Sequence, residues 1–272
     1  VVDVSDPAAP AIIGAVYTYT SDMEARDDLL FLASQSIGLQ IVDVSDPAEP
    51  EMLGTADMPN SAVGVTVSGD LAFVTTSGFS SETGTLNVVD VSDPARPAII
   101  GSFDTPDDAT GVAVSGDLAF VTAEESGLLV IDVSVPENPQ IISSVDMNDA
   151  KRVAISDDLA FVASGDSGLQ LIDINDPMNP TIIGSLVPTE WVGNVAVNSD
   201  LALVAAADLK TIDASDPVNP TILGSADTPE LTFDVAVNGD SAYLADRDNG
   251  LQIINVTDPA HPTTLGSADT PG

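Results

Sequence analysis

The chain has 272 residues, of which 43 are acidic and six are basic, so its net charge at neutral pH is −37. This charge argues against nucleic acid and anionic membrane surfaces as partners, because both require a basic footprint. The absence of cysteine excludes disulfides and thiol-ligated zinc, and no run of 18 apolar residues is present that could insert into a membrane.

A phrase of the type Val-Val-Asp-Val-Ser-Asp-Pro recurs along the chain, with its first acidic position at intervals of 40 to 47 residues. That position is occupied in the seven copies by Asp3, Asp43, Asp90, Asp132, Asp173, Asp213 and Asn255. A repeat of this length is one supersecondary unit, which must bury its apolar faces against neighbouring copies.

One unit, taken from residue 111 to residue 146, predicts four short strands in succession. They cover residues 111–117, 118–123, 127–134 and 140–146, each rich in Val, Ile or Ala and bounded by Gly, Asp, Ser or Pro. No stretch has the apolar spacing of a helix. Four antiparallel strands in about 42 residues are typical of a propeller blade, so the sequence predicts an all-β propeller.

Side-chain size indicates the order of the strands within a blade. The first strand alternates Val with Ala or Gly, which suits a crowded innermost position, as at Ala113. The fourth strand follows a proline such as Pro139, and proline is tolerated at a sheet edge, so this strand is expected at the outer rim. The aromatic residue of the second strand, for example Phe120, is expected to pack between neighbouring blades.

Complete sets of four strands start near residues 22, 63, 111, 152, 194 and 234, which predicts six full blades. The N-terminus adds only a third and a fourth strand, at residues 1–4 and 11–16, and therefore a half blade. Seven blade positions are favoured, with six as the alternative. Repeats fill residues 1–272, which predicts one domain. Because the chain starts in mid-repeat without a Met, we expect a processed product or a segment of a longer protein.

The third strand and its turn resemble the LVIVD repeat of bacterial and archaeal surface-associated proteins, over essentially the whole chain. The copies most similar to that repeat are Gly-Leu-Leu-Val-Ile-Asp-Val at residues 127–133 and Gly-Leu-Gln-Leu-Ile-Asp-Ile at residues 168–174. The resemblance implies a β-propeller, an extracellular or cell-surface location and attachment to larger surface proteins. It implies no established reaction and supplies no catalytic residue.

The candidate ligand site lies where the repeats differ. At the first position of the innermost strand the copies read Asp22, Gly64, Gly111, Arg152, Asn194 and Asp234. Basic residues are rare in this chain, yet three of the six fall in these strands. The sequence therefore predicts a polar pocket at the channel mouth, with ion pairs lining a wet channel as the alternative. The candidate residues are Asp22, Glu24, Arg26, Lys151, Arg152, Trp191, Asn194 and Asp234.

The loop of residues 104–108 has the highest density of carboxylates at the end of an outer strand. Asp104, Asp107 and Asp108 are thus the candidate cation ligands, and calcium is the cation that such oxygens would hold. No other cofactor is expected. The only histidine, His261, follows an Asp-Pro turn, and no catalytic triad or zinc site can be built around it.

Two functions remain open at this point. The first is a non-enzymatic extracellular or cell-surface scaffold for binding or adhesion, whose ligand would be a protein or a carbohydrate. The alternative is a metal-dependent propeller hydrolase or lyase with a cation at the channel mouth, where Asp22, Glu24, Asp104 and Asp234 could hold it. The acidic composition also predicts adaptation to salty surroundings, where screening reduces repulsion between carboxylates.

Overall fold

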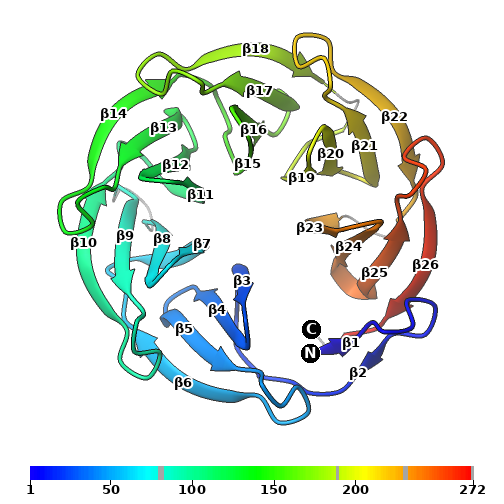
Figure 1. The fold of residues 1–272 in the computed structure, drawn as a ribbon, viewed down its shortest axis with the longest axis horizontal. Helices are drawn as coiled ribbons and strands as arrows, with labels where there is room; N and C mark the ends of the chain where they lie inside the picture. The colour runs from blue at the N-terminus through cyan, green and yellow to red at the C-terminus, as the bar shows by residue number, and fades with distance from the viewer. Residues whose placement is uncertain (79–82, 188–189, 229–231, 271–272) are drawn as a thin grey trace. The chain divides into compact units, whose positions relative to one another are not determined.

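The computed structural model describes residues 1–78, 83–187, 190–228 and 232–270. In these residues the strands form six four-stranded antiparallel sheets and one two-stranded sheet (Figure 1). The β-propeller prediction is therefore confirmed, with six complete blades and an N-terminal partial blade. A single short helical element is present in the described residues, a 3-10 turn at Arg247–Asn249 between the second and third strands of the last blade.

The blades belong to two compact units. The first unit consists of residues 14–150 with 177–179 and contains three blades. Its strands are β3 (Asp22–Arg26), β4 (Leu29–Ser34), β5 (Gly38–Asp43), β6 (Glu51–Ala56), β7 (Ser61–Ser68), β8 (Leu71–Ser77), β9 (Thr85–Asp90), β10 (Ala98–Asp104), β11 (Ala109–Ser115), β12 (Leu118–Ala123), β13 (Gly127–Asp132) and β14 (Gln140–Val145).

The second unit consists of residues 1–13, 151–176 and 180–272, and it contains three blades and the partial blade. Its strands are β1 (Val2–Asp3), β2 (Ala11–Ile12), β15 (Arg152–Ser156), β16 (Leu159–Ala163), β17 (Leu169–Asp173), β18 (Thr181–Leu186), β19 (Asn194–Asn198), β20 (Leu201–Ala205), β21 (Leu209–Asp213), β22 (Thr221–Ala226), β23 (Thr232–Asn238), β24 (Ser241–Asp246), β25 (Gly250–Asn255) and β26 (Thr263–Ala268). The single domain expected from the sequence stays a prediction.

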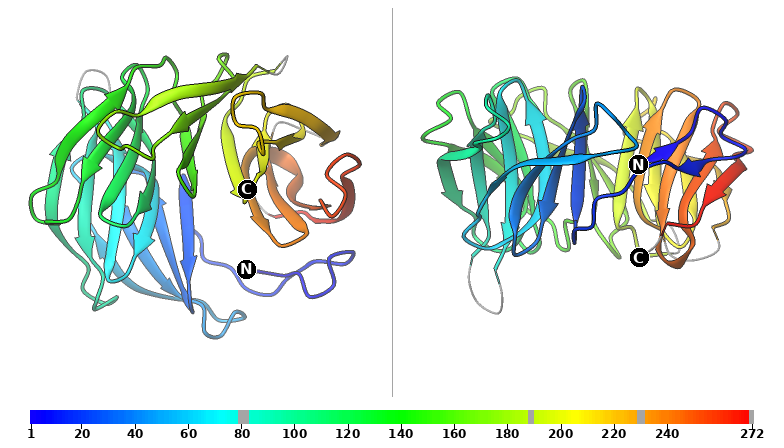
Figure 2. Two further views of the ribbon diagram at one scale, coloured as in Figure 1. Left: turned by 45° about the horizontal axis from the view of Figure 1, so that its top comes forward. Right: turned by 90° about the horizontal axis from the view of Figure 1, so that it is seen from below.

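Each blade follows the predicted order, with consecutive strands hydrogen-bonded side by side (Figure 2). The first strands of neighbouring blades contact one another within each unit, β3 with β7 and β7 with β11, and β15 with β19 and β19 with β23. This is the arrangement expected of innermost strands, and it explains their small side chains. Tight hairpins join the first two strands, and glycines with positive φ such as Gly116 (φ 58°) form the turn.

The hydrophobic cores lie between neighbouring blades rather than within a single sheet. Phe31 of β4 packs in one cluster with Val65 of β7, Val74 of β8 and Val89 of β9, all of the next blade. Phe161 of β16 belongs to an equivalent cluster with the strands β19–β21. The predicted role of the second-strand aromatic is confirmed at these positions. A blade therefore buries its apolar faces only by stacking on a neighbour.

The repeated Asp-Val-Ser-Asp-Pro turn has a structural role. The carboxylate of Asp90 accepts a hydrogen bond from Ser92 N at 2.9 Å, and the equivalent bond recurs in the other copies. The carbonyl of the turn proline lies against a glycine of the preceding blade's outer strand, because a Cβ on Gly101 would lie 2.0 Å from Pro136 O. The hydrogen bond within the turn stabilises its conformation, and the contact with the glycine fixes the distance between the turn and the preceding blade.

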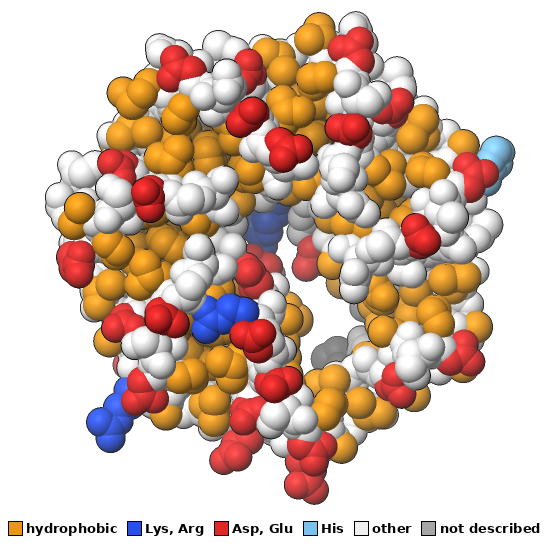
Figure 3. Space-filling model, in the orientation of Figure 1, with side chains coloured by type: hydrophobic (Ala, Val, Ile, Leu, Met, Phe, Trp, Pro, Cys, Tyr) orange, Lys and Arg blue, Asp and Glu red, His pale blue; other side chains and the backbone are white. Residues whose placement is uncertain are grey.

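Acidic side chains are scattered over the surface among neutral and apolar ones, as the face in Figure 3 shows. Within the described residues, no helix is long and apolar enough to cross a membrane.

Candidate functional site

Strand β3 carries three of the predicted site residues, all in the first unit, and their side chains bond to the neighbouring strand β7 and its hairpin. Asp22 Oδ2 accepts a hydrogen bond from Val65 N at 3.0 Å, and Glu24 Oε2 accepts one from Val67 N at 3.1 Å. Both carboxylates therefore satisfy backbone N–H groups of the next innermost strand, which is a stabilising role between two blades.

Arg26 lies at the opposite end of β3 from Asp22. Its guanidinium donates a hydrogen bond to Gly69 O in the hairpin that follows β7, and it stacks on the ring of Phe31 with 5.3 Å between the guanidinium carbon and the ring centroid. Asn198 bonds in the same way to Gly239 O in the other unit, at 3.3 Å. This end of the strand thus ties neighbouring blades together through side chain to backbone contacts.

In the second unit, Arg152 and Asn194 begin the strands β15 and β19, and Asp234 is the third residue of the next innermost strand, β23. Asn194 Nδ2 donates to Asp234 Oδ1 at 2.5 Å, and Asp234 Oδ1 also accepts from its own neighbour Val235 N at 2.8 Å. Burial raises the pKa of Asp234, while the bond from Val235 N and the positive charge of Arg152 act in the opposite direction. These three residues form a polar cluster whose carboxylate is costly to ionise.

Lys151 and Trp191 flank this cluster in sequence. Lys151 N bonds to Ala163 O at 2.8 Å and its side chain is half-buried. Trp191 is 47% exposed, and its ring lies over the backbone of Gly193, where a Cβ would lie 2.4 Å from Cζ3. The residue before it, Glu190, forms an ion pair with Lys210 (3.6 Å). The tryptophan therefore presents an apolar surface on an anchored loop.

The eight predicted residues thus form two groups, one in each unit. The contacts within each group show that most of these side chains bond to neighbouring strands, and whether any of them binds a ligand stays a prediction.

The carboxylates of the acidic loop after β10 accept hydrogen bonds from neighbouring loops. Asp108 Oδ1 accepts from Gly78 N at 2.8 Å, and Asp107 Oδ2 accepts from Ser126 Oγ at 2.5 Å. Asp104 is the last residue of β10 and is exposed. Among the described residues, no group of three acidic or histidine side chains is placed to hold a metal ion. The calcium contact at Asp104, Asp107 and Asp108 therefore stays a prediction.

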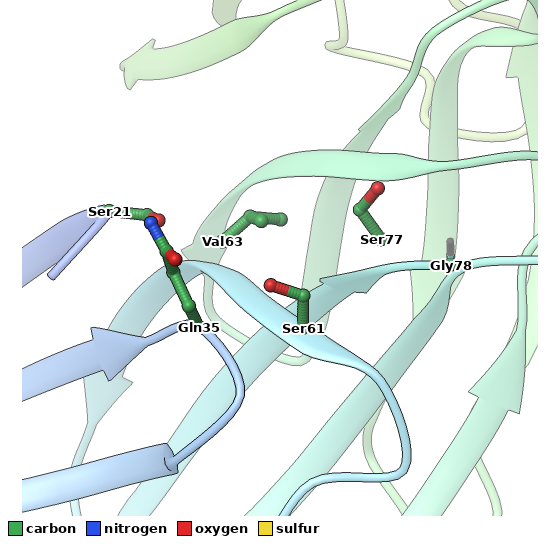
Figure 4. A pocket seen from close by; sticks show the side chains of 6 residues that line it. All are labelled: Ser21, Gln35, Ser61, Val63, Ser77 and Gly78. Carbon is green, nitrogen blue, oxygen red and sulfur yellow. The ribbon is translucent and has the colours of Figure 1, made fainter. Parts of the chain in front are cut away.

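A pocket of about 280 Å³ lies in the first unit, where the innermost strands β3 and β7 begin and the second strand β8 ends (Figure 4). Its described lining provides three hydroxyls, one amide and no charged side chain. In Figure 4 the Gln35 amide lies beside Ser21, on one side of the pocket. The lining residues are Ser21, Gln35, Ser61, Val63, Ser77 and Gly78.

The backbone around this pocket is fixed by two bonds between blades. Gln35 N donates to Ala62 O at 3.1 Å, and Ala62 N donates to Gln35 O at 2.9 Å. Gln35 adopts a positive φ of 42°, which is uncommon for a residue with a side chain. Strained backbone of this kind concentrates at ligand sites, and here it holds the amide side chain at the pocket edge.

The sequence predicts a pocket at this end of the innermost strands but does not indicate these residues. Two of the pocket residues could have been found one position before the predicted first residue of the innermost strand, where all six copies carry a different residue. That column reads Ser21, Val63, Thr110, Lys151, Gly193 and Phe233. Variation at equivalent positions of a repeat marks a surface that the scaffold does not constrain, and two of these six residues line the pocket.

A family model described as the LVIVD repeat matches nearly the whole length of the chain. The match consists of seven segments, at residues 1–18, 19–57, 59–105, 106–147, 148–187, 191–228 and 231–270. No curated protein matches the chain.

Solved structures similar to this one share its fold at low sequence identity. One is the RRP9 WD40 repeats, with a TM-score of 0.76 at 10% identity over 96% of this chain and 83% of that one. Another is a functionally unknown protein from Desulfotomaculum acetoxidans, with a TM-score of 0.71 at 16% identity over 90% and 80%. The computationally designed Ika8 protein has a TM-score of 0.66 at 10% identity over 89% and 72%. These similarities support the propeller fold alone.

Proposed function

Because the chain belongs to the LVIVD repeat family, we propose that it is a non-enzymatic scaffold at the cell surface that binds a neutral carbohydrate. The family match over the whole chain supports the repeat scaffold. The highly acidic, cysteine-free composition suits a protein exposed to a saline medium. The described lining of the pocket in the first unit has no charged side chain, which supports the choice of ligand.

The chemistry of the pocket favours neutral polar ligands over charged ones. The hydroxyls of Ser21, Ser61 and Ser77 can each donate and accept, and the Gln35 amide can do both through separate atoms. Sugar hydroxyls have the same dual character. An anionic ligand would meet the repulsion of a chain with net charge −37, and a cationic one would find no carboxylate in the described lining.

The size of the pocket limits the ligand. A volume of about 280 Å³ lies near the lower end of the range for small-molecule sites. The pocket therefore suits one sugar unit at a chain end or branch, with the rest of the glycan outside. Val63 supplies an apolar contact for the C–H face of that sugar.

The test is a glycan array followed by calorimetric titration of each glycan that binds. We expect binding to neutral glycans that is lost in Ser77→Leu, which fills the pocket, and weakened in Ser61→Ala, which removes one hydroxyl. The matched control is Ser68→Leu, an exposed position at the far end of β7, which should bind like the wild type. Binding restricted to charged glycans, no binding at all, or undiminished binding by Ser77→Leu would refute the proposal.

The proposed location is tested separately. Brief protease treatment of intact cells should remove the chain from the cell fraction while a cytosolic marker stays intact. Full protection of the chain until the cells are lysed would contradict a surface location.

A further inference from the structure

Two β-bridges between neighbouring blades have the same form, one in each unit. In the first unit Gln35 pairs with Ala62 at the edge of the pocket, and in the second unit Gly165 pairs with Val192. Gly165 N donates to Val192 O and Val192 N donates to Gly165 O, both at 3.0 Å. The residues beside the second bridge are therefore the structural equivalents of the residues that line the pocket in the first unit.

The bridge in the second unit carries an aromatic residue at an equivalent position. Trp191 stands one residue before the bridge, where the first unit has Ser61. Gly193 stands one residue after it, where the first unit has Val63. Ser61 is buried, whereas Trp191 is 47% exposed. The second unit thus presents an exposed aromatic ring where the first unit has a buried hydroxyl.

The absence of a side chain at residue 193 gives the Trp191 ring its place. A Cβ on Gly193 would lie 2.4 Å from Cζ3 and 2.8 Å from Cη2 of the ring. Gly193 is not among the glycines with a positive φ, so its backbone conformation does not require glycine. The other five copies all carry a side chain at this position. The glycine therefore allows the ring to pack on the backbone, and any side chain there would displace the ring.

Ion pairs of Lys210 anchor the residue next to the tryptophan. Lys210 Nζ lies 2.9 Å from each carboxylate oxygen of Asp208 and 3.6 Å from a carboxylate oxygen of Glu190, which precedes Trp191. The other complete blades carry Gly or Thr at the position of Asp208 and Gln, Asn or Leu at the position of Lys210. Both charged residues are therefore departures from the repeat that coincide with the tryptophan.

An exposed carboxylate adjoins the same bridge. Asp166 follows the bridged Gly165, and its side chain is exposed. An exposed indole beside a carboxylate suits a cation, because the face of the ring attracts positive charge and the carboxylate pairs with it. Arginine meets both conditions, since its planar guanidinium stacks on aromatic rings and donates two parallel hydrogen bonds to a carboxylate. The chain already contains this stacking, with Arg26 at 5.3 Å from the centroid of the Phe31 ring.

The charge of the surroundings agrees with a cationic ligand. Residues 165–167, 190–193 and 208–210 together carry three carboxylates and one ammonium group. Two further basic residues, Lys151 and Arg152, lie at the start of the neighbouring strand β15, and the positive charge of Arg152 acts on Asp234. With a net charge of −37, the chain as a whole attracts cationic partners.

We propose that Trp191 and Asp166 bind an arginine side chain in a basic segment of a partner protein. The guanidinium stacks on the exposed indole and pairs with the carboxylate. Gly193 and the ion pairs of Lys210 are positioning elements, which hold the ring in place before the partner arrives. A ring that is already held in place loses little conformational entropy on binding. Binding here does not require a glycan in the pocket of the first unit.

The first experiment uses the fluorescence of Trp191, which is the only tryptophan of the chain. An end-blocked peptide of alternating arginine and glycine is titrated against the whole chain, and quenching of the tryptophan by acrylamide is measured. We expect saturable protection of Trp191 that weakens as NaCl rises, because salt screens the charges. The same peptide with citrulline, a neutral isostere of arginine, should give no protection. Because the tryptophan is the reporter, a peptide bound elsewhere on the acidic surface gives no signal.

The second experiment repeats the titration with three variants. Asp166→Asn removes the carboxylate and Gly193→Ala displaces the ring, so each should raise the half-saturating concentration of the arginine peptide by about two- to fivefold. The melting temperature of Gly193→Ala should stay close to that of the wild type, because the atoms that must move belong to a half-exposed side chain. Asp200→Asn is the matched control, since it makes the same change in net charge on the hairpin between β19 and β20, and it should bind like the wild type.

Three outcomes would overturn the proposal: no protection by the arginine peptide, equal protection by the citrulline peptide, or equal weakening by Asp166→Asn and Asp200→Asn. Ser77→Leu, which fills the pocket in the first unit, should leave the protection of Trp191 unchanged. Failure of glycan binding at that pocket and failure of arginine binding at Trp191 are therefore distinguishable.

Discussion

The contact between an outer-strand glycine and the next blade's turn gives a quantitative prediction for Gly184→Ala. A Cβ at this position would lie 1.9 Å from Pro217 O and 3.0 Å from Pro217 C, roughly 1.5 Å inside ordinary van der Waals contact. Overpacking against a backbone costs about 1–3 kcal/mol. Ala lowers the conformational entropy of the unfolded chain, which offsets about 0.4–1 kcal/mol of this cost. The free energy of unfolding is therefore expected to fall by about 1–2 kcal/mol.

This loss should be visible in urea unfolding as a lower midpoint with an unchanged slope. The melting temperature should fall by about 2–8 °C, because a domain of this size loses about 2–4 °C per kcal/mol. The control is Ser185→Ala, at the next residue on the exposed face, which should stay within about 0.5 kcal/mol of the wild type.

Gly266→Ala provides a second comparison. Its Cβ would meet Pro7 O at 2.4 Å, but Pro7 belongs to a two-stranded sheet that can shift more easily than a complete blade. Its midpoint should therefore fall less than that of Gly184→Ala. An unchanged midpoint for Gly184→Ala would refute the reasoning that the glycine fixes the spacing between blades.

Four further predictions follow from burial and charge. The melting temperature should rise with NaCl, since salt screens repulsion among 37 excess negative charges, and a flat or falling curve from dilute buffer to molar salt would contradict this. Phe120→Ala should cost about 3–5 kcal/mol because Phe120 is 1% exposed, whereas Phe233→Ala, at 59% exposure, should change the unfolding midpoint little. The hydrogen bonds from Ser134 lower the pKa of Asp132 in the folded protein. The wild type should therefore be more stable than Asp132→Ala above the ordinary Asp pKa of 3.8, and this difference in stability should vanish as the pH falls through the lowered pKa. A difference in stability that grows in acid would contradict the prediction. Arg152→Ala should raise the pKa of Asp234 in a carboxyl NMR titration, because the positive charge of Arg152 opposes the effect of burial. An unchanged pKa of Asp234 would show that Arg152 does not act on this carboxyl group.

The architecture could be predicted from the sequence because each blade repeats the same local rules. Gly116 marks a hairpin and Pro139 marks an outer strand, and every copy agrees on the order of strands. The half blade followed from the same counting, since residues 1–4 and 11–16 match only the third and fourth strands. Agreement among copies removes the ambiguity that a single apolar run would leave.

The pocket residues could not be predicted in the same way, because they depend on distances between blades. Gln35 directly follows β4 and Ser77 ends β8, and both line the pocket only because Ser21, just before β3, and Ser61, at the start of β7, lie near them. The charged side chains of β3 have the chemistry of ligand-binding groups, yet Arg26 lies at the far end of the strand and donates to Gly69 O. Side-chain type alone does not indicate whether a polar group faces a ligand or a neighbouring backbone.

We infer that the residues shared by the repeats stabilise the scaffold, whereas residues that differ among the repeats bind the ligand. The most direct test measures the melting temperature and the glycan affinity of Asp90→Ala and Ser77→Leu side by side. Asp90 bonds to Ser92 N in the shared turn, and Ser77 lines the pocket. We expect a lower melting temperature with unchanged affinity for Asp90→Ala, and lost affinity with a nearly unchanged melting temperature for Ser77→Leu. The reverse pattern, or loss of both properties in both variants, would contradict it.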